Sequence, residues 1–200
     1  NIQCQLCLKQ MLMEVCQTKL NIIGLQKKTQ STHTINNMKH ICATLLLLCS
    51  SPFSETENAF IQEVKECALQ VNADMQPYDR IPINLVIAQA IHESNWGKSR
   101  FAVEGNNLFG IKAVEGEDYM LSKSNNAKVK TYLTWCESVV DYIELLSFGE
   151  PYKEFKQELV DSWVVDRVDI YYIIEFLYNY AEDRFYKQKI TKILKQLERQ

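Results

Sequence analysis

The chain has 200 residues, an apolar share of 46% and a formal net charge of −3. This composition fits one globular domain with additional segments, since domains commonly have about 100 to 150 residues, and it excludes a fully disordered chain. The slightly negative charge provides no basic field for a polyanion, so we expect no binding to nucleic acid. We also expect the protein to be a monomer.

A candidate export signal lies near the N-terminus. Met38 opens a short positive stretch, which is followed by a leucine-rich apolar run and then by small residues. This pattern is typical of a secretory signal peptide, and the run is shorter than the roughly 20 apolar residues that span a bilayer. We expect residues 38–54 to be a signal peptide, residues 1–37 to be an upstream, non-native extension, and the protein to be exported to the periplasm or cell envelope. Lipidation of Cys49 is an alternative.

Seven cysteines are present, but only Cys67 and Cys136 lie in the part that is expected to fold. This distribution does not suggest a framework of several disulfides. The N-terminal Cys4 and Cys7 have too few suitably spaced ligands around them for a zinc site, which needs about four. We predict no metal and no cofactor.

The folded part begins with two amphipathic helices. Apolar residues recur at helical spacing over 59–72, and a loop is predicted at 75–81. Pro82 then opens a second helix, because its fixed φ and missing N–H are tolerated in a first turn. Gly97 can end this helix in a left-handed conformation.

The periodicity changes between Gly110 and Thr134. Residues 119–121 and 129–132 flank a turn-rich tip, which predicts a β-hairpin with a longer loop. Further helices are predicted at 136–147, 151–159, 170–183 and 185–198. Together these elements predict a mostly α (α+β), lysozyme-like domain over 57–200, with one small hairpin beside a cleft.

Glu93 carries the clearest chemical signal. It follows Ala90 by three residues and therefore borders the buried face of its helix. It also lies in the last turn, where the helix dipole and unpaired carbonyls disfavour a negative charge, and burial beside Trp96 would disfavour ionisation further. A carboxyl that stays protonated can donate its proton to a departing glycosidic oxygen. The position alone also fits an ordinary surface glutamate.

The sequence around and after Glu93 contains four ordered blocks. They are Ile81–Ala102 with Gln89-Ala90-Ile91-His92-Glu93-Ser94-Asn95-Trp96-Gly97, then Glu104-Gly105-Asn106-Asn107-Leu108-Phe109-Gly110, Tyr132-x-Thr134-x-x-Glu137-Ser138-x-x-Asp141-Tyr142, and Tyr180-Ala181-Glu182-Asp183-x-x-Tyr186-x-x-Lys189-Ile190. With these blocks the sequence resembles the Bax-type proteins and their relatives, the flagellar and autolysin glucosaminidases. The resemblance covers roughly Phe60 to the C-terminus, and it implies hydrolysis of a β-1,4 bond that follows N-acetylglucosamine, usually in peptidoglycan.

The resemblance implies that Glu93 is the catalytic acid and that Tyr180 orients the N-acetyl group or a water, although Tyr180 equally fits packing. Relatives often carry a second acidic residue on the hairpin. The stretch just before the turn has no carboxylate here, and Glu117 is the catalytic candidate that we choose instead. The second half of the reaction stays open between water activation by Glu117 and attack by the substrate's own acetamido oxygen.

Five further residues are candidates for binding the glycan. Asn106, Asn107 and Phe109 would form a loop that faces the cleft, where amides bond sugar groups and an aromatic ring stacks on a sugar face. The same stretch equally fits a structural turn before the hairpin. Tyr132 and Trp96 complete the set, although Trp96 also fits packing against the helix of Glu93.

The predicted function is an endo-N-acetylglucosaminidase that cleaves β-1,4 bonds in peptidoglycan or another glycan containing N-acetylglucosamine. A lytic transglycosylase, which uses one glutamate on a similar fold, is one alternative, and a non-catalytic domain that binds the cell wall is another. The sequence has no nucleophile–histidine arrangement or zinc-ligand cluster that would support peptide-bond chemistry.

Overall fold

Residues 53–165, 167–181 and 183–199 are described by the computed structural model. The predicted extension at 1–37 and nearly all of the predicted signal peptide at 38–54 lie outside these residues. The helices are α3 (Glu55–Asp74), α4 (Ile83–Ser94), α5 (Arg100–Gly105), α6 (Trp135–Phe148), α7 (Lys153–Val164), α8 (Ile170–Ile173) and α9 (Tyr186–Leu197), the strands are β1 (Tyr119–Leu121) and β2 (Lys128–Lys130), and short 3-10 turns lie at Pro77–Asp79, Glu150–Tyr152 and Ile174–Phe176.

Helix α3 begins at Glu55, four residues before the predicted start. The Ser54 side chain accepts a hydrogen bond from the Glu57 backbone N–H at 3.3 Å, and the Glu57 carboxylate accepts one from the Ser54 backbone N–H at 2.8 Å. This reciprocal capping box satisfies two N–H groups that a helix start leaves free. The apolar spacing used for the prediction begins only after the cap, so it could not mark this end.

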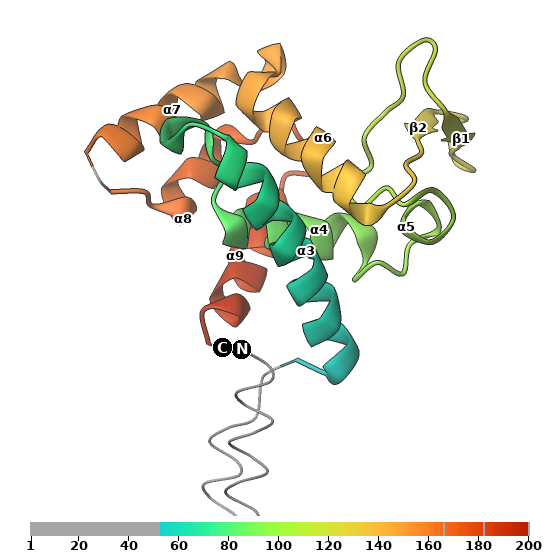
Figure 1. Cartoon of the computed structure of the whole chain (residues 1–200), viewed down its shortest axis with the longest axis horizontal. Coiled ribbons are helices and arrows are strands. Elements are labelled where there is room, and N and C mark those ends of the chain that lie inside the picture. Colours follow the sequence, from blue (N-terminus) through green and yellow to red (C-terminus); the bar gives the residue numbers. More distant parts are fainter. Residues whose placement is uncertain (1–52, 166, 182, 200) are drawn as a thin grey trace, which may run out of the picture. The chain divides into compact units, whose positions relative to one another are not determined.

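Helix α4 is the central helix of the domain. It packs against α3 and α9, and α3 also packs against α6 (Figure 1). Every residue from Leu85 to Ile91 is buried, including the polar Gln89. Burial on nearly the whole circumference explains why apolar residues fill more of α4 than one stripe, since a surface helix would show a polar face. Its last turn is thereby fixed against the core.

The small hairpin lies to one side of the helices, next to α5 (Figure 1). Strands β1 and β2 are antiparallel, with Tyr119 opposite Lys130 and Leu121 opposite Lys128. The first strand agrees with the prediction, whereas the second ends at Lys130 instead of 132. It ends there because the Tyr132 backbone N–H donates to the Gly105 carbonyl, at 2.9 Å, and leaves the ladder.

The predicted helix over 170–183 is wrong beyond its first half. Helix α8 covers only Ile170–Ile173, a 3-10 turn covers Ile174–Phe176, and the following described residues up to α9 are turns and irregular backbone. The segment is rich in aromatic and β-branched residues, which have weak helix propensity. A tertiary contact then decides its path: the Asn179 side chain donates to the Pro151 carbonyl at 2.8 Å.

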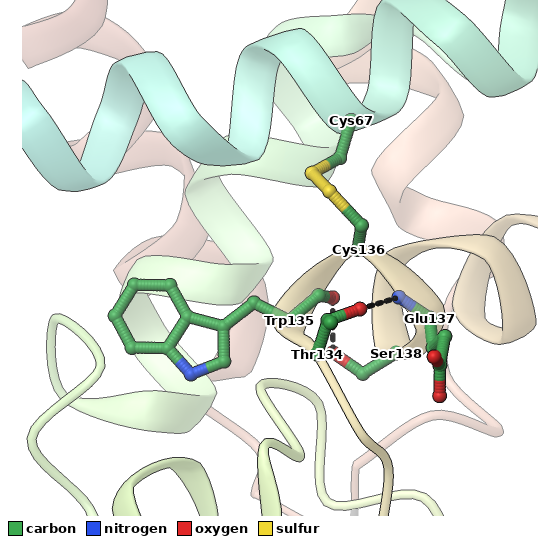
Figure 2. The surroundings of a disulfide bond; sticks show 6 residues. All are labelled: Cys67, Thr134, Trp135, Cys136, Glu137 and Ser138. Atoms are coloured by element: carbon green, nitrogen blue, oxygen red, sulfur yellow. Dashed lines mark hydrogen bonds between the residues drawn. A yellow bond between two sulfur atoms is a disulfide. The ribbon is translucent and has the colours of Figure 1, made fainter.

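A disulfide joins Cys67 in α3 to Cys136 in α6, with the two Cα atoms 5.2 Å apart (Figure 2). This pairing was not predicted from the sequence. Helix α6 starts one residue before Cys136 because the Thr134 hydroxyl accepts from the Glu137 backbone N–H at 3.2 Å. The bond therefore connects the middle of one helix to the first turn of another.

Among the residues that the structure describes, no helix combines the length and apolar character needed to cross a membrane.

Candidate functional site

Helix α4 ends abruptly just after Glu93. The cap is Asn95, in the left-handed region with φ 50°, and Trp96 (φ 62°) and Gly97 (φ 71°) follow it there. The sequence predicted that Gly97 ends this helix. The cap is Asn95 instead, and Gly97 is the last of three left-handed residues. The Ser94 hydroxyl stabilises the turn by donating to the Ala90 carbonyl at 2.6 Å and accepting from the Gly97 N–H at 2.7 Å. Left-handed non-glycine residues each cost about 1 kcal/mol or more, so packing holds a strained end here.

The Glu93 carboxyl lies in this last turn and is only partly exposed. Its Oε1 atom is buried and has no hydrogen-bond partner among the described residues. Burial raises the pKa of Glu93 above its ordinary value, while a hydrogen bond from the Tyr186 hydroxyl and the charge of Lys189 act in the opposite direction. The main physical cause is desolvation, which disfavours the charged carboxylate.

Tyr180 belongs to an aromatic cluster beside Glu93. Its ring stacks on Tyr186, with centroids 5.8 Å apart, and meets Tyr142 edge-on at 6.0 Å. Its hydroxyl donates to the Phe109 carbonyl at 2.9 Å. Burial raises the pKa of Tyr180 well above its ordinary value, so it remains a neutral phenol. Because its proton is already used, the oxygen of Tyr180 can serve a substrate only by accepting a hydrogen bond.

The loop with Asn106, Asn107 and Phe109 is built as a structural turn. The Asn107 side chain is 1% exposed and makes four hydrogen bonds: it donates to the Ile111 and Lys130 carbonyls and accepts from the Phe109 and Ile111 N–H groups. No donor of this amide is left for a sugar. Asn106 caps α5 in the left-handed region and donates to the carbonyls of residues 132 and 133, both at 3.0 Å.

Phe109 and Trp96 are both packed against other rings. Phe109 is 3% exposed and stacks on Tyr142, with ring centroids 4.0 Å apart. Trp96 is partly buried and meets Phe53 and Phe60 edge-on, at 5.2 and 6.1 Å. These contacts indicate that both rings support the site by packing on other aromatic rings, and that neither offers an open face for stacking on a sugar.

Glu117 and Tyr132 meet in a network that joins the hairpin to α6. The Lys130 ammonium lies 2.6 Å from the Glu117 carboxylate and 2.7 Å from Asp141. The Tyr132 hydroxyl donates to the same Asp141 carboxylate at 2.7 Å. Hydrogen bonding to Lys130 and to the Val114 backbone N–H lowers the pKa of Glu117. Glu117 is therefore an ion-paired carboxylate, unlike Glu93.

Among the described residues, no group of three or more His, Cys, Asp or Glu side chains is arranged to hold a metal ion.

A family model described as mannosyl-glycoprotein endo-beta-N-acetylglucosaminidase matches residues 69–199. The chain belongs to this glucosaminidase family. All eight predicted site residues lie within the matched range, as do Gln89 and Tyr186, to which the sequence analysis assigned no role.

Two curated relatives and one solved structure show how far the likeness extends. Exo-glucosaminidase LytG of Bacillus subtilis (strain 168) is 33% identical over 118 residues, which cover 53% of this chain and 42% of LytG. Protein bax of Escherichia coli (strain K12) is 35% identical over 91 residues, covering 43% of this chain and 31% of bax. The matched part is thus less than half of either relative. The catalytic domain of the autolysin Auto from Listeria monocytogenes superposes with a TM-score of 0.57 at 21% identity, over 86% of this chain and 98% of that domain. This likeness confirms the predicted lysozyme-like, mostly helical fold.

Proposed function

We propose that this glucosaminidase-family domain is a glycosidase that cleaves β-1,4 N-acetylglucosaminyl bonds of peptidoglycan, as an endo-N-acetylglucosaminidase, with Glu93 as the general acid. The observation that carries the proposal is the Glu93 carboxyl itself. It is partly buried, one of its oxygens has no partner among the described residues, and burial raises its pKa. A carboxyl with these properties can hold a proton at a pH where exposed glutamates have lost theirs.

In the proposed reaction Glu93 gives its proton to the glycosidic oxygen as the bond between that oxygen and the anomeric carbon breaks. Water then supplies a hydroxyl to the anomeric carbon and a proton that restores Glu93. General acid catalysis of this kind contributes about a hundredfold to ten-thousandfold.

The second half of the reaction has two candidate routes. Glu117 could activate the water, but its lowered pKa and its ion pair with Lys130 make it a weak base. The acetamido oxygen of the substrate could instead attack the anomeric carbon as the protonated glycosidic oxygen leaves, with the Tyr180 oxygen accepting a hydrogen bond from the acetamido N–H. Water would then add to the anomeric carbon and open the ring formed in this step, which regenerates the acetamido group. Tyr180 already donates its hydroxyl proton to the Phe109 carbonyl, which fits this accepting role of its oxygen. We favour the acetamido route for this reason.

The glycan-binding candidates divide by exposure. Tyr132 and Asn106 are partly exposed and remain candidates for direct contact, whereas Asn107 and Phe109 are buried and would act by holding the turn. Trp96 would likewise act by supporting the end of α4.

An exported, cell-envelope location is part of the proposal. The Cys67–Cys136 disulfide supports it, because such bonds persist mainly in oxidising compartments. The signal-like pattern at 38–54 points the same way. Names of the relatives also refer to glucosaminidase and autolysin activity.

The product of the reaction tests the proposal. Purified peptidoglycan digested with the protein and reduced with borohydride should yield muropeptides that end in reduced N-acetylglucosamine, detected by mass spectrometry. Internal cleavage should give fragments of many lengths, whereas release of single terminal sugars would indicate an exo-acting enzyme. Anhydro sugars would show a lytic transglycosylase, and binding without any product would show a wall-binding domain. Anhydro sugars, or binding without any product, would contradict the proposed hydrolysis.

A further inference from the structure

A buried amide lies one helical turn before Glu93. Gln89 is completely buried in α4, four residues before Glu93 and on the same side of the helix. A buried amide is costly unless it is hydrogen-bonded. Both ends of the Gln89 amide are bonded: Tyr142 donates its hydroxyl proton to Oε1, and Nε2 donates to the Tyr186 hydroxyl oxygen at 2.7 Å. Both partners are tyrosines buried in the core.

The direction of each hydrogen bond follows from Glu93. The Tyr186 hydroxyl interacts with the Glu93 carboxyl and lowers its pKa. When Glu93 is ionised its carboxylate can only accept, so the Tyr186 hydroxyl is then the donor. The Tyr186 oxygen then has to accept, and Nε2 of Gln89 is the donor that faces it. Oε1 is left as an acceptor, and the Tyr142 hydroxyl fills it. The chain of donors runs in one direction only, from Tyr142 through Gln89 and Tyr186 to Glu93.

We propose that Gln89 is a positioning residue which, with its amide fixed by Tyr142, turns the Tyr186 hydroxyl proton toward the Glu93 carboxyl. This inference rests on the proposed function of Glu93. A hydroxyl that accepts a hydrogen bond is also polarised into a better donor. Gln89 therefore acts on Glu93 through Tyr186 and touches neither the substrate nor the reacting atoms.

The other titratable groups that interact with Glu93 come from α6, from α9 and from the loop that precedes α9. Tyr142 approaches from α6, Tyr180 from the loop before α9, and Tyr186 and Lys189 from α9. Lys189 is held by an ion pair with Asp183 at 2.5 Å. His92 neighbours Glu93 on α4, and its ring meets Tyr186 edge-on at 5.5 Å.

The arrangement balances two opposing effects on the acid. Burial favours the protonated carboxyl, and the hydrogen bond from Tyr186 favours the carboxylate and lowers the pKa of Glu93. A general acid needs both properties, because it must hold its proton in the resting enzyme and release it in the transition state. Loss of the Tyr186 hydrogen bond would leave burial opposed only by the charge of Lys189, so the pKa of Glu93 would rise.

The test compares the pH dependence of kcat/KM on purified peptidoglycan for Gln89→Met, Tyr186→Phe and the double variant. The basic limb reports loss of the Glu93 proton. Weakening the bond to the carboxylate raises the pKa of Glu93, so the basic limb should shift to higher pH in both single variants. If Gln89 acts through Tyr186, the double variant should shift no further than Tyr186→Phe alone.

Gln188→Met is the matched control, since Gln188 is exposed on α9 and the same change there should leave the limb in place. Rates are taken per folded molecule, measured by circular dichroism. If Gln89→Met does not fold, Tyr142→Phe removes the bond that fixes the amide and should shift the limb in the same direction.

Two results would overturn the inference. One is a basic limb for Gln89→Met, or for Tyr142→Phe in its place, that overlays the wild type, and the other is a shift of the double variant equal to the sum of the single shifts. Glu93→Gln separates this failure from that of the proposed function. An active Glu93→Gln variant would refute the catalytic role of Glu93, whereas an inactive one with an unmoved Gln89→Met limb would refute only the role of Gln89.

Discussion

Gly97 is the residue on which the geometry around Glu93 most depends. Its φ of 71° is unfavourable for any side chain, and an added Cβ would lie 2.7 Å from Cη2 of Trp135 and 3.0 Å from Cε2 of Phe60. We expect Gly97→Ala to destabilise the domain by about 2–4 kcal/mol, from conformational strain plus overpacking. Chemical denaturation measures the change in the free energy of unfolding.

Gly110→Ala is the control for that substitution. Gly110 has a similar φ of 69° but no atom within 4 Å of an added Cβ. It should lose only the conformational part, about 1–2 kcal/mol. Equal losses at the two positions would contradict the assigned contact of Gly97 with Trp135 and Phe60.

The raised pKa of Glu93 also predicts a dependence of stability on pH. A carboxyl with a higher pKa in the folded state binds its proton more tightly there, so its contribution to stability is complete below the unfolded pKa and is lost as the pH rises through the folded pKa. Each pKa unit corresponds to about 1.4 kcal/mol. We therefore expect Glu93→Gln to be more stable than the wild type at pH 7 and about equally stable at pH 4.

Thermal unfolding of both proteins at the two pH values measures this difference. Glu63→Gln, at an exposed position of α3, serves as a control for removing one negative charge. A gain in stability for Glu93→Gln at pH 4 as large as at pH 7 would be incompatible with a raised pKa.

Residues differ in how much of their role the sequence revealed. The spacing of Glu93 to Ala90 predicted that it borders the buried face of its helix, and its predicted place in the last turn of α4 is confirmed. The contacts of Gln89 with Tyr142 and Tyr186 could not be predicted, because they join residues 53 and 97 positions apart. One signal was the polar type of Gln89 within the otherwise apolar stretch from Leu85 to Ile91.

At the scale of elements, the disulfide between Cys67 and Cys136 holds α3 against α6. It closes a loop with a sequence separation of 69, and the loss of chain entropy in the unfolded state corresponds to about 4 kcal/mol. We expect the double variant Cys67→Ser/Cys136→Ser to lose stability of this order, and reductant to do the same to the wild type.

Thermal unfolding with and without a phosphine reductant tests the disulfide, with the double serine variant as the control that should not respond. A wild type whose melting temperature is unchanged by complete reduction would contradict the stabilising role of the bond. The pairing was missed from the sequence because spacing alone does not place two cysteines on facing helices.

Lys130 of β2 joins the hairpin to α6 by its ion pair with Asp141, and it also pairs with Glu117 in the loop before β1. Lys130→Met should return the pKa of Glu117 upward toward its ordinary value. If Glu117 is the base of the reaction, the acidic limb of kcat/KM should move to higher pH in this variant, since a base is lost as the pH falls through its pKa. An acidic limb that stays in place would exclude Glu117 from that role and favour the acetamido route.

Helices were predictable where the local sequence pattern agreed with the tertiary packing. Helix α4 was predicted because Pro82 marks its start and apolar residues fill it. The segment at 170–183 was predicted as one helix, and it fails because its irregular part is set by contacts with distant residues, such as the bond from Asn179 to the Pro151 carbonyl. Such contacts are not encoded in local spacing.

At the scale of the molecule, the helices that pack around the central α4 bury its last turn, and this burial raises the pKa of Glu93. Glu93 ends a helix that is buried on nearly all sides, so its carboxyl is desolvated by elements that come from both ends of the domain. The fold class was predictable because a mostly helical pattern with one hairpin has few packing solutions. The degree of burial at Glu93 required the folded structure.

The most direct test of Glu93 as the general acid is to compare the release of reducing ends from purified peptidoglycan by Glu93→Gln and by the wild type. Glutamine keeps the shape of the side chain but has no acidic proton to give. The account predicts that turnover falls by at least about a hundredfold, while the circular dichroism spectrum and glycan binding are retained. A Glu93→Gln variant that releases reducing ends at the wild-type rate would contradict it.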